Sequence, residues 1–160
     1  MATPALARSL RLERGTSDDL DSVMTVMEAA FGQRYGEAWT RSQCAGILPM
    51  AGVALTLARD ADGDAIGFSL VRTVADESEL LLIAVLPDHH RRGVGRNLME
   101  DFFDRARRDG VRRVHLEVRD GNPAVAMYRS AGFETVGRRR NYYHGSNGDR
   151  YDAITLAFDL

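Results

Sequence analysis

An arginine-rich loop with two glycines is the segment of this sequence best suited to bind an anion. It runs Leu86-Pro87-Asp88-His89-His90-Arg91-Arg92-Gly93-Val94-Gly95-Arg96 and lies between an apolar segment and a long amphipathic one. Glycines let the backbone approach a ligand, free N–H groups at a helix start attract negative charge, and guanidinium groups suit phosphate oxygens. The residues expected to bind phosphate are Arg91, Arg92, Gly93, Val94, Gly95 and Arg96. The alternative is a glycine turn beside solvated arginines.

The two common nucleotide-binding motifs do not account for this loop. A Walker loop requires a lysine, and all 21 basic residues of this chain are arginine. A dinucleotide fingerprint requires a third glycine where this sequence has Leu98. The absence of lysine also excludes Schiff-base chemistry.

A second chemical feature is the alternating segment Arg113–Arg119. Its period of two predicts apolar residues on one face and charged residues, Glu117 among them, on the other. If the strand is central, its polar face looks into a cleft, and Glu117 is a candidate general base or water-positioning group. If it is an edge strand, the same face is simply solvated.

Tyr128 and the remaining polar residues give weaker signals. Tyr128 is either a core aromatic or a hydroxyl donor at the cleft. The adjacent His89 and His90 lack metal-ligand spacing, and the single cysteine, Cys44, excludes an internal disulfide and a multi-cysteine metal site. No metal is expected.

Periodicity and turn residues predict the elements that position these groups. Strands are expected at Ser9–Arg14, Gly52–Arg59, Ala65–Ala75, Leu80–Leu86, Val111–Arg119, Phe133–Arg140 and Tyr151–Phe158. Helices are expected at Leu20–Phe31, about Thr40–Leu48, Val94 to Gly110 and Pro123 to Gly132. Thr16 and Asp19 form a capping box before the first helix. The fold class is therefore α/β (α+β), a mixed central sheet of about seven strands flanked by about four helices.

The composition bounds the kind of protein. The chain has 160 residues, 44% hydrophobic and 28% charged, which predicts one globular domain over residues 1–160. Its longest apolar run, Leu80–Leu86, is too short to span a bilayer, and no secretory signal is read in Met1–Arg14. We therefore expect a cytoplasmic protein that does not bind membranes. The net charge of −2 does not favour nucleic-acid binding, although residues 88–140 carry 13 arginines against 8 acidic residues.

Several of these segments resemble the GNAT N-acetyltransferases. They are the apolar strand Leu80–Leu86, the loop Arg91–Arg96, the strand His115–Arg119 and the region Asn122–Phe133 with its Met127-Tyr128 and Gly132-Phe133 pairs. The resemblance covers nearly the whole chain and includes the order of the elements. The segments Glu117–Arg119, Arg139–Tyr143 and Asp152–Ile154 are similar in particular to the ribosomal-protein N-terminal alanine acetyltransferases (RimI-like).

The resemblance implies an acetyl-CoA-dependent N-acetyltransferase that acetylates a primary amine, with the N-terminal α-amine of a protein such as a small-subunit ribosomal protein as the first candidate. The pyrophosphate of acetyl-CoA would bind the loop at residues 91–96. The residues implied to hold the pantetheine arm are Ile83, Ala84, Val85 and Asn122. By the same carry-over, Glu117 is the general base and Tyr128 the general acid. The sequence places no serine or cysteine nucleophile, so direct attack is expected.

Two aromatic, polar segments, Gln33–Trp39 and Asn141–His144, could flank a groove for an extended peptide. Trp39, Tyr142 and Tyr143 are the residues expected to bind it. Acidic residues near them, Glu37 and Asp152 among others, could favour a cationic N-terminus. The expected partners are acetyl-CoA and a protein or peptide N-terminus, and the expected state is a monomer or weak dimer.

Three other functions stay open from the sequence. The enzyme could acetylate a small-molecule amine or an antibiotic, because the same donor loop would serve. It could be a non-catalytic CoA-binding module. It could also be a nucleic-acid-binding adaptor that uses the run Arg138–Arg140.

Overall fold

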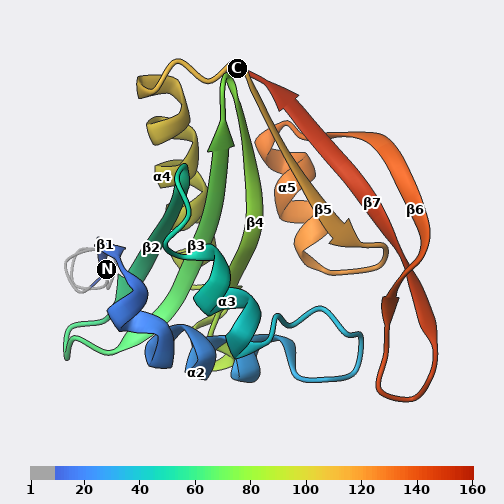
Figure 1. Ribbon diagram of the computed structural model, residues 1–160, viewed down its shortest axis with the longest axis horizontal. Helices are drawn as coiled ribbons and strands as arrows, with labels where there is room; N and C mark the ends of the chain where they lie inside the picture. The colour runs from blue at the N-terminus through green and yellow to red at the C-terminus, as the bar shows by residue number, and fades with distance from the viewer. Residues whose placement is uncertain (1–9) are drawn as a thin grey trace.

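Seven strands form one sheet in the order β1-β2-β3-β4-β5-β7-β6 (Figure 1). The computed structural model describes residues 10–160. The strands are β1 Arg11–Gly15, β2 Val53–Arg59, β3 Ala65–Val74, β4 Glu77–Val85, β5 Arg113–Arg119, β6 Glu134–His144 and β7 Arg150–Asp159. Every neighbouring pair is antiparallel except β4 and β5, which are parallel. The predicted mixed sheet is confirmed.

Within residues 10–160, four α-helices and two 3-10 helices accompany these strands. The α-helices are α2 Leu20–Phe31, α3 Arg41–Ile47, α4 Val94–Arg108 and α5 Ala124–Ala131, and the 3-10 helices are η1 Ser17–Asp19 and η2 Pro87–His89. None of the helices within residues 10–160 has the length and apolar character that crossing a membrane requires.

Side-chain capping sets where the first two α-helices of the described chain begin. The predicted capping box of Thr16 and Asp19 is present, and it caps η1 immediately before α2. A second capping box, of Thr40 and Gln43, starts α3 and was not predicted. Each box satisfies backbone N–H groups that would otherwise have no partner at the helix start.

Most predicted boundaries lie within a few residues of the observed ones, and two differences have clear causes. The strand expected from Val111 begins at Arg113, because the Val111 N–H bonds back to the Ala106 carbonyl and finishes the turn after α4. The strand expected to end at Arg140 continues to His144 through a bulge. Ser9, the expected first residue of the first strand, lies outside the described residues.

The parallel pairing of β4 with β5 is short. Its register covers only Glu77 to Glu79 of β4 and Arg113 to His115 of β5. Figure 1 shows the two strands side by side near the C-terminus and separating toward α2. Beyond Glu79, β4 therefore has no strand neighbour on this side among the described residues.

A bulge in β4 lies close to the end of that pairing. The β3–β4 register pairs Leu70 with Leu82 but Val71 with Leu80, so Leu81 is an extra residue on β4. As a result Leu80 packs in one core and Leu82 in the other. Simple alternation would place them on the same face.

The two faces of the sheet carry separate hydrophobic cores. One lies between α2, α3 and strands β2 to β4 and contains Val26, Met27, Leu57, Phe68 and Leu70. The other lies between α4, α5 and strands β4, β5 and β7 and contains Met99, Phe102, Leu116, Tyr128 and Leu156. Both faces of the sheet are therefore covered, as the continuous apolar run in β4 predicts.

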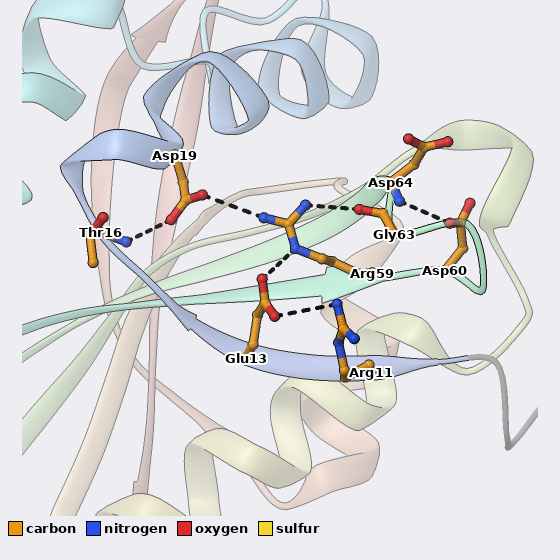
Figure 2. A network of polar contacts seen from close by, with 8 residues as sticks. All are labelled: Arg11, Glu13, Thr16, Asp19, Arg59, Asp60, Gly63 and Asp64. Atoms are coloured by element: carbon orange, nitrogen blue, oxygen red, sulfur yellow. Dashed lines mark hydrogen bonds and ion pairs between the residues drawn. The ribbon is translucent and has the colours of Figure 1, made fainter.

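Arg59 ties the N-terminal strand to the β2–β3 hairpin (Figure 2). Its guanidinium forms ion pairs with Glu13 of β1 and with Asp19 of η1, and it donates to the Gly63 carbonyl at 3.0 Å. The Arg59 side chain is 16% exposed. These contacts hold the edge strand and the start of α2 against the hairpin.

The Arg59–Glu13 pair predicts an acid-sensitive contribution to stability. The hydrogen bond from Arg59 lowers the pKa of Glu13 from its ordinary value of 4.5. The contribution of this pair to stability is therefore fully present above about pH 4.5. It is lost as the pH falls through the lowered pKa that Glu13 has in the folded state. We expect Arg59→Gln to lower the Tm at neutral pH, and the Tm difference from the original protein to shrink between about pH 5 and pH 3.

Thermal unfolding by circular dichroism across this pH range measures both effects. Arg41→Gln is the matched control, because Arg41 pairs with Asp21 on the surface, where the two side chains are 58% and 86% exposed. A Tm difference for Arg59→Gln that stays constant down to pH 3 would contradict the assignment.

Candidate active site

The loop before α4 presents backbone N–H groups that bind nothing else. Arg91 has a positive φ of 63° and Gly93, at the N-cap, one of 80°. No side chain caps the helix, and the first N–H that bonds back is that of Asn97, to the Gly93 carbonyl. The amides of Val94, Gly95 and Arg96 are thus free of partners within residues 10–160. This is the arrangement that binds anions at helix N-termini.

Positive side chains surround these amides. Arg91, Arg92 and Arg96 are exposed, and none of them forms an ion pair with another residue of the described chain. Gly95 lies against the neighbouring elements, since an added Cβ would be 3.6 Å from Met127 of α5 and 3.8 Å from Val85 of β4. The loop therefore joins the end of β4, α4 and α5 at one point.

The last residues of β4 offer an unpaired strand edge toward β5. Ala84 is buried, and Ile83 and Val85 are partly exposed. Within the described chain no strand pairs with them on the β5 side. His90 Nε2 lies 3.0 Å from the Val85 carbonyl oxygen, so a ring protonated at Nε2 donates to it and fixes the loop to the strand end.

Glu117 lies on a central strand. β5 pairs with β7 along its whole length and with β4 at its start. The apolar residues of β5 face α4 and α5, and Glu117 faces the opposite side, where its side chain is only 18% exposed. This environment matches the cleft interpretation of the polar face. Arg139 of β6 forms an ion pair with Glu117, with Nε and Oε1 2.7 Å apart.

Arg119 and Glu37 form a sheltered ion pair beside Glu117. The Arg119 Nε donates to Glu37 Oε1 at 3.2 Å, and the two side chains are 9% and 11% exposed. The guanidinium also lies 3.6 Å from the centre of the Tyr35 ring. Glu37 and Tyr35 belong to the loop between α2 and α3, so this contact holds that loop against β5.

Asn122 extends this contact to α5. Its Nδ2 donates to Glu37 Oε2 at 2.8 Å, and its Oδ1 accepts the Ala124 N–H at 2.8 Å. The side chain therefore caps the start of α5 and joins it to the α2–α3 loop. Its role toward a ligand stays a prediction, and both ends of its amide already have protein partners.

Tyr128 is buried in the core formed with α4 and α5, where its ring lies edge-on to Phe133 at 5.9 Å. Burial raises the pKa of its phenol above the ordinary value of 10, and Tyr143 and Glu37 add to this rise. Those two groups belong to the face of the sheet that carries Glu117.

Tyr143 belongs to the same neighbourhood, and Tyr142 is more exposed. Burial raises the pKa of Tyr143, followed by the effects of Glu37, Tyr142 and Glu117, whereas Arg119 lowers it. Tyr142 is 46% exposed and meets the Tyr143 ring at 88°. Both tyrosines follow Asn141, which has a positive φ of 54° within the β6–β7 bulge.

The α2–α3 loop meets the β6–β7 hairpin at two glycines. A Cβ on Gly36 would lie 2.1 Å from the His144 carbonyl oxygen, and one on Gly145 would lie 2.5 Å from the Arg34 carbonyl oxygen. The two segments expected to flank a groove are therefore in direct contact. Trp39, at the end of the first segment, is partly buried and packs against the α2–α3 core.

Two of the acidic residues expected to favour a cationic N-terminus have partners in the structure. Glu37 pairs with Arg119 and accepts a hydrogen bond from Asn122. Asp152 pairs with Arg138 at 2.9 Å. Their role toward an acceptor stays a prediction. Sequence reasoning missed the pairing of Arg139 with Glu117, which follows from the position of β7 between β5 and β6. It also missed the pairing of Arg119 with Glu37, which follows from the packing of the α2–α3 loop against β5.

The structure also has a cavity of about 270 Å³ away from these residues. It is lined by residues that include Arg14, Leu48, Thr73 and Asp109. None of the residues expected to act in the site lines it. We place the candidate site by its convergent polar groups and not by this cavity.

Comparison with known proteins identifies the family of the chain. A sequence model described as the acetyltransferase (GNAT) family matches residues 20–133. The chain is 42% identical over 100 residues to the [ribosomal protein bS18]-alanine N-acetyltransferase of Escherichia coli K12, which covers 62% of this chain and 67% of that protein. It is 48% identical over 83 residues to the N-alpha-acetyltransferase RimI of Mycobacterium tuberculosis, or 51% of each chain.

The fold agrees with a solved structure. The crystal structure of the ribosomal-protein-S18-alanine N-acetyltransferase from Escherichia coli superposes with a TM-score of 0.85 and 31% identity. The superposition covers 94% of both chains.

The sheltered position of Glu37 predicts a large effect on stability. Glu37→Ala leaves the Arg119 guanidinium without its carboxylate and Asn122 without its acceptor. We expect the free energy of unfolding to fall by about 3 kcal/mol, because removing one partner of a buried ion pair leaves the other charge buried without a partner. Urea unfolding followed by fluorescence measures it. Glu100→Ala, at an exposed position of α4, is the control. An equal loss of unfolding free energy in both variants would show that the contacts of Glu37 do not stabilise the protein.

Proposed function

The chain belongs to the acetyltransferase (GNAT) family, and on this premise we propose that it acetylates the N-terminal α-amine of a protein, with a ribosomal protein as the first candidate. It is an acetyl-CoA-dependent N-acetyltransferase. Proteins named as acetyltransferases of the alanine of ribosomal protein bS18 are 42% identical to it. The observation that carries the proposal is the sheltered Glu117 on the central strand β5, 18% exposed, in a sheet whose neighbouring strand β4 has an unpaired edge.

The donor half of the site suits acetyl-CoA. The free amides of Val94, Gly95 and Arg96, with the arginines around them, would bind the pyrophosphate. The unpaired edge at Ile83, Ala84 and Val85 would hydrogen-bond the amide groups of the pantetheine arm, as another strand would. Backbone N–H groups at the end of this edge would stabilise the oxyanion that forms during transfer.

Glu117 would act as the general base on the acceptor. An α-amine has a pKa of about 7.7–8.0, roughly two units below a lysine amine, so only a modest proton affinity must be overcome. A carboxylate acting directly or through one water can take this proton as the nitrogen attacks the thioester. Cys44 is 1% exposed, which agrees with direct transfer and no acyl-enzyme.

Tyr128 would serve as the general acid toward the leaving sulfur. Its raised pKa keeps the phenol protonated at every pH at which a carboxylate base works. A thiol has a pKa of about 8.5, so complete transfer from this phenol is unfavourable early in the reaction. Tyr128 therefore stabilises the sulfur mainly as a hydrogen-bond donor while its charge develops.

These roles predict distinct kinetic effects. Glu117→Gln is expected to lower kcat about 100-fold, mainly at lower pH, where fewer acceptor amines are already neutral. Tyr128→Phe is expected to lower kcat at every pH, because the phenol does not titrate in the working range. Release of CoA thiol from acetyl-CoA measures both, and Glu100→Gln is the control. Unchanged rates in both variants would remove these roles.

The choice of acceptor is tested with the unaltered protein. We expect turnover of peptides that begin with Ala or Ser, with the acetyl group on the N-terminal nitrogen by mass spectrometry. Polyamines are the comparison substrates. Turnover of polyamines with none of the peptides would replace the proposal by a small-amine acetyltransferase, and tight acetyl-CoA binding without any turnover would indicate a binding module.

A further inference from the structure

Two arginines lie in one row across the C-terminal part of the sheet, and they are held very differently. The register places Arg119 of β5 and Arg139 of β6 on either side of Ala153 of β7. Arg119 turns to Glu37, and its contact is both an ion pair and a hydrogen bond between side chains that are 9% and 11% exposed. Arg139 turns to Glu117, and its contact is an ion pair only.

The residues of β6 and β7 that lie between Arg139 and Glu117 have small side chains. Thr155 is the β7 partner of both Glu117 and Gly137, so the row next to Arg139 has no side chain on β6. Ala153, between the two arginines, is fully buried under its neighbours. The long arginine side chain therefore reaches over β7 and lays its Nε 2.7 Å from Glu117 Oε1.

This ion pair is weakly held on the arginine side. The Arg139 side chain is 62% exposed, whereas that of Glu117 is 18% exposed. Ion pairs with one solvated, flexible partner add little to stability and exchange readily. The Tyr142 ring lies 5.5 Å from the guanidinium and would keep it on this face after it leaves the carboxylate.

We propose that Arg139 is a displaceable counter-ion of Glu117, which holds the place of the acceptor's ammonium group in the free enzyme and must give way when the acceptor binds. This inference rests on the proposed function, because it requires Glu117 to receive the amine. An α-amine is mostly protonated at pH 7 and arrives as a cation. Two cations then compete for one sheltered carboxylate, and arginine keeps its charge at every working pH.

The competition gives Arg139 a part in selecting acceptors. An acceptor without a positive charge gains nothing at Glu117 to offset the loss of the ion pair. A positively charged amine replaces it, gives its proton to the carboxylate and attacks. Arg139 is thus a positioning residue that acts through Glu117 and raises the acceptor concentration needed for half-maximal rate.

Steady-state kinetics at pH 7 with saturating acetyl-CoA and an Ala-initiated peptide test the proposal. Arg139→Gln is expected to lower KM for the peptide about threefold to fivefold, with kcat within about twofold of the original protein. Arg140→Gln, the neighbouring exposed arginine, is expected to change neither. Guanidinium chloride at non-denaturing concentration should inhibit Arg139→Gln competitively against the peptide, more than sodium chloride of equal ionic strength does.

A higher KM, or a kcat that falls more than tenfold at unchanged KM, or no change at all, would each overturn the proposal. Calorimetric titration of the peptide into CoA-saturated protein makes the comparison without turnover, and tighter binding by Arg139→Gln is the supporting result. Failure of the proposed function looks different: the original protein acetylates no peptide, or Glu117→Gln keeps the full rate. Circular dichroism of each variant shows that it is folded.

Discussion

The early end of the pairing between β4 and β5 is the constraint that organises this molecule. Two parallel strands that stayed together beyond Glu79 would satisfy their backbone groups with each other. Because they separate, the end of β4 keeps a free edge near the first amides of α4, which have no partner among the described residues. Tyr128 belongs to the core on the side of α4 and α5, and burial there raises the pKa of its phenol.

The charges around Glu117 are sorted by how strongly each is held. The Arg119–Glu37 pair is sheltered, hydrogen-bonded and continued to α5 by Asn122, so it acts as part of the framework. The Arg139–Glu117 pair has one solvated partner and is suited to exchange. The two arginines of this row thus differ in how firmly they are held, because the Arg119 side chain is 9% exposed and that of Arg139 is 62% exposed.

The sequence predicts the elements of this fold well because their signals are local. The capping box at Thr16 and the glycine after α5 lie within one turn of the helix boundary that they mark. The periodicity of apolar residues lies within the element that it predicts. The bulge at Leu81 left no such signal, since every residue from Leu80 to Leu86 is apolar and suits either core. Glu117 was found as a polar residue in an alternating strand, and the central position of β5 agrees with a sheltered face.

The partners of the site residues could not be predicted in the same way. Glu37 and Arg119 are far apart in the chain, and their contact depends on the α2–α3 loop packing against β5. The contact of Glu117 with Arg139 depends on the order β5-β7-β6. That order reverses the last two strands relative to the sequence. When a charged residue such as Glu37 is interpreted from its own segment alone, it is easily assigned to a ligand, although it pairs with a residue of a distant strand.

The contact between the α2–α3 loop and the β6–β7 hairpin bears on how such an enzyme could be re-engineered. Gly36 and Gly145 leave no room for a side chain where the two segments meet. A hairpin transplanted from a relative would need a glycine at position 145, and the loop that receives it would need Gly36, whatever the tyrosines of the hairpin were. The loop and the hairpin therefore have to be exchanged together.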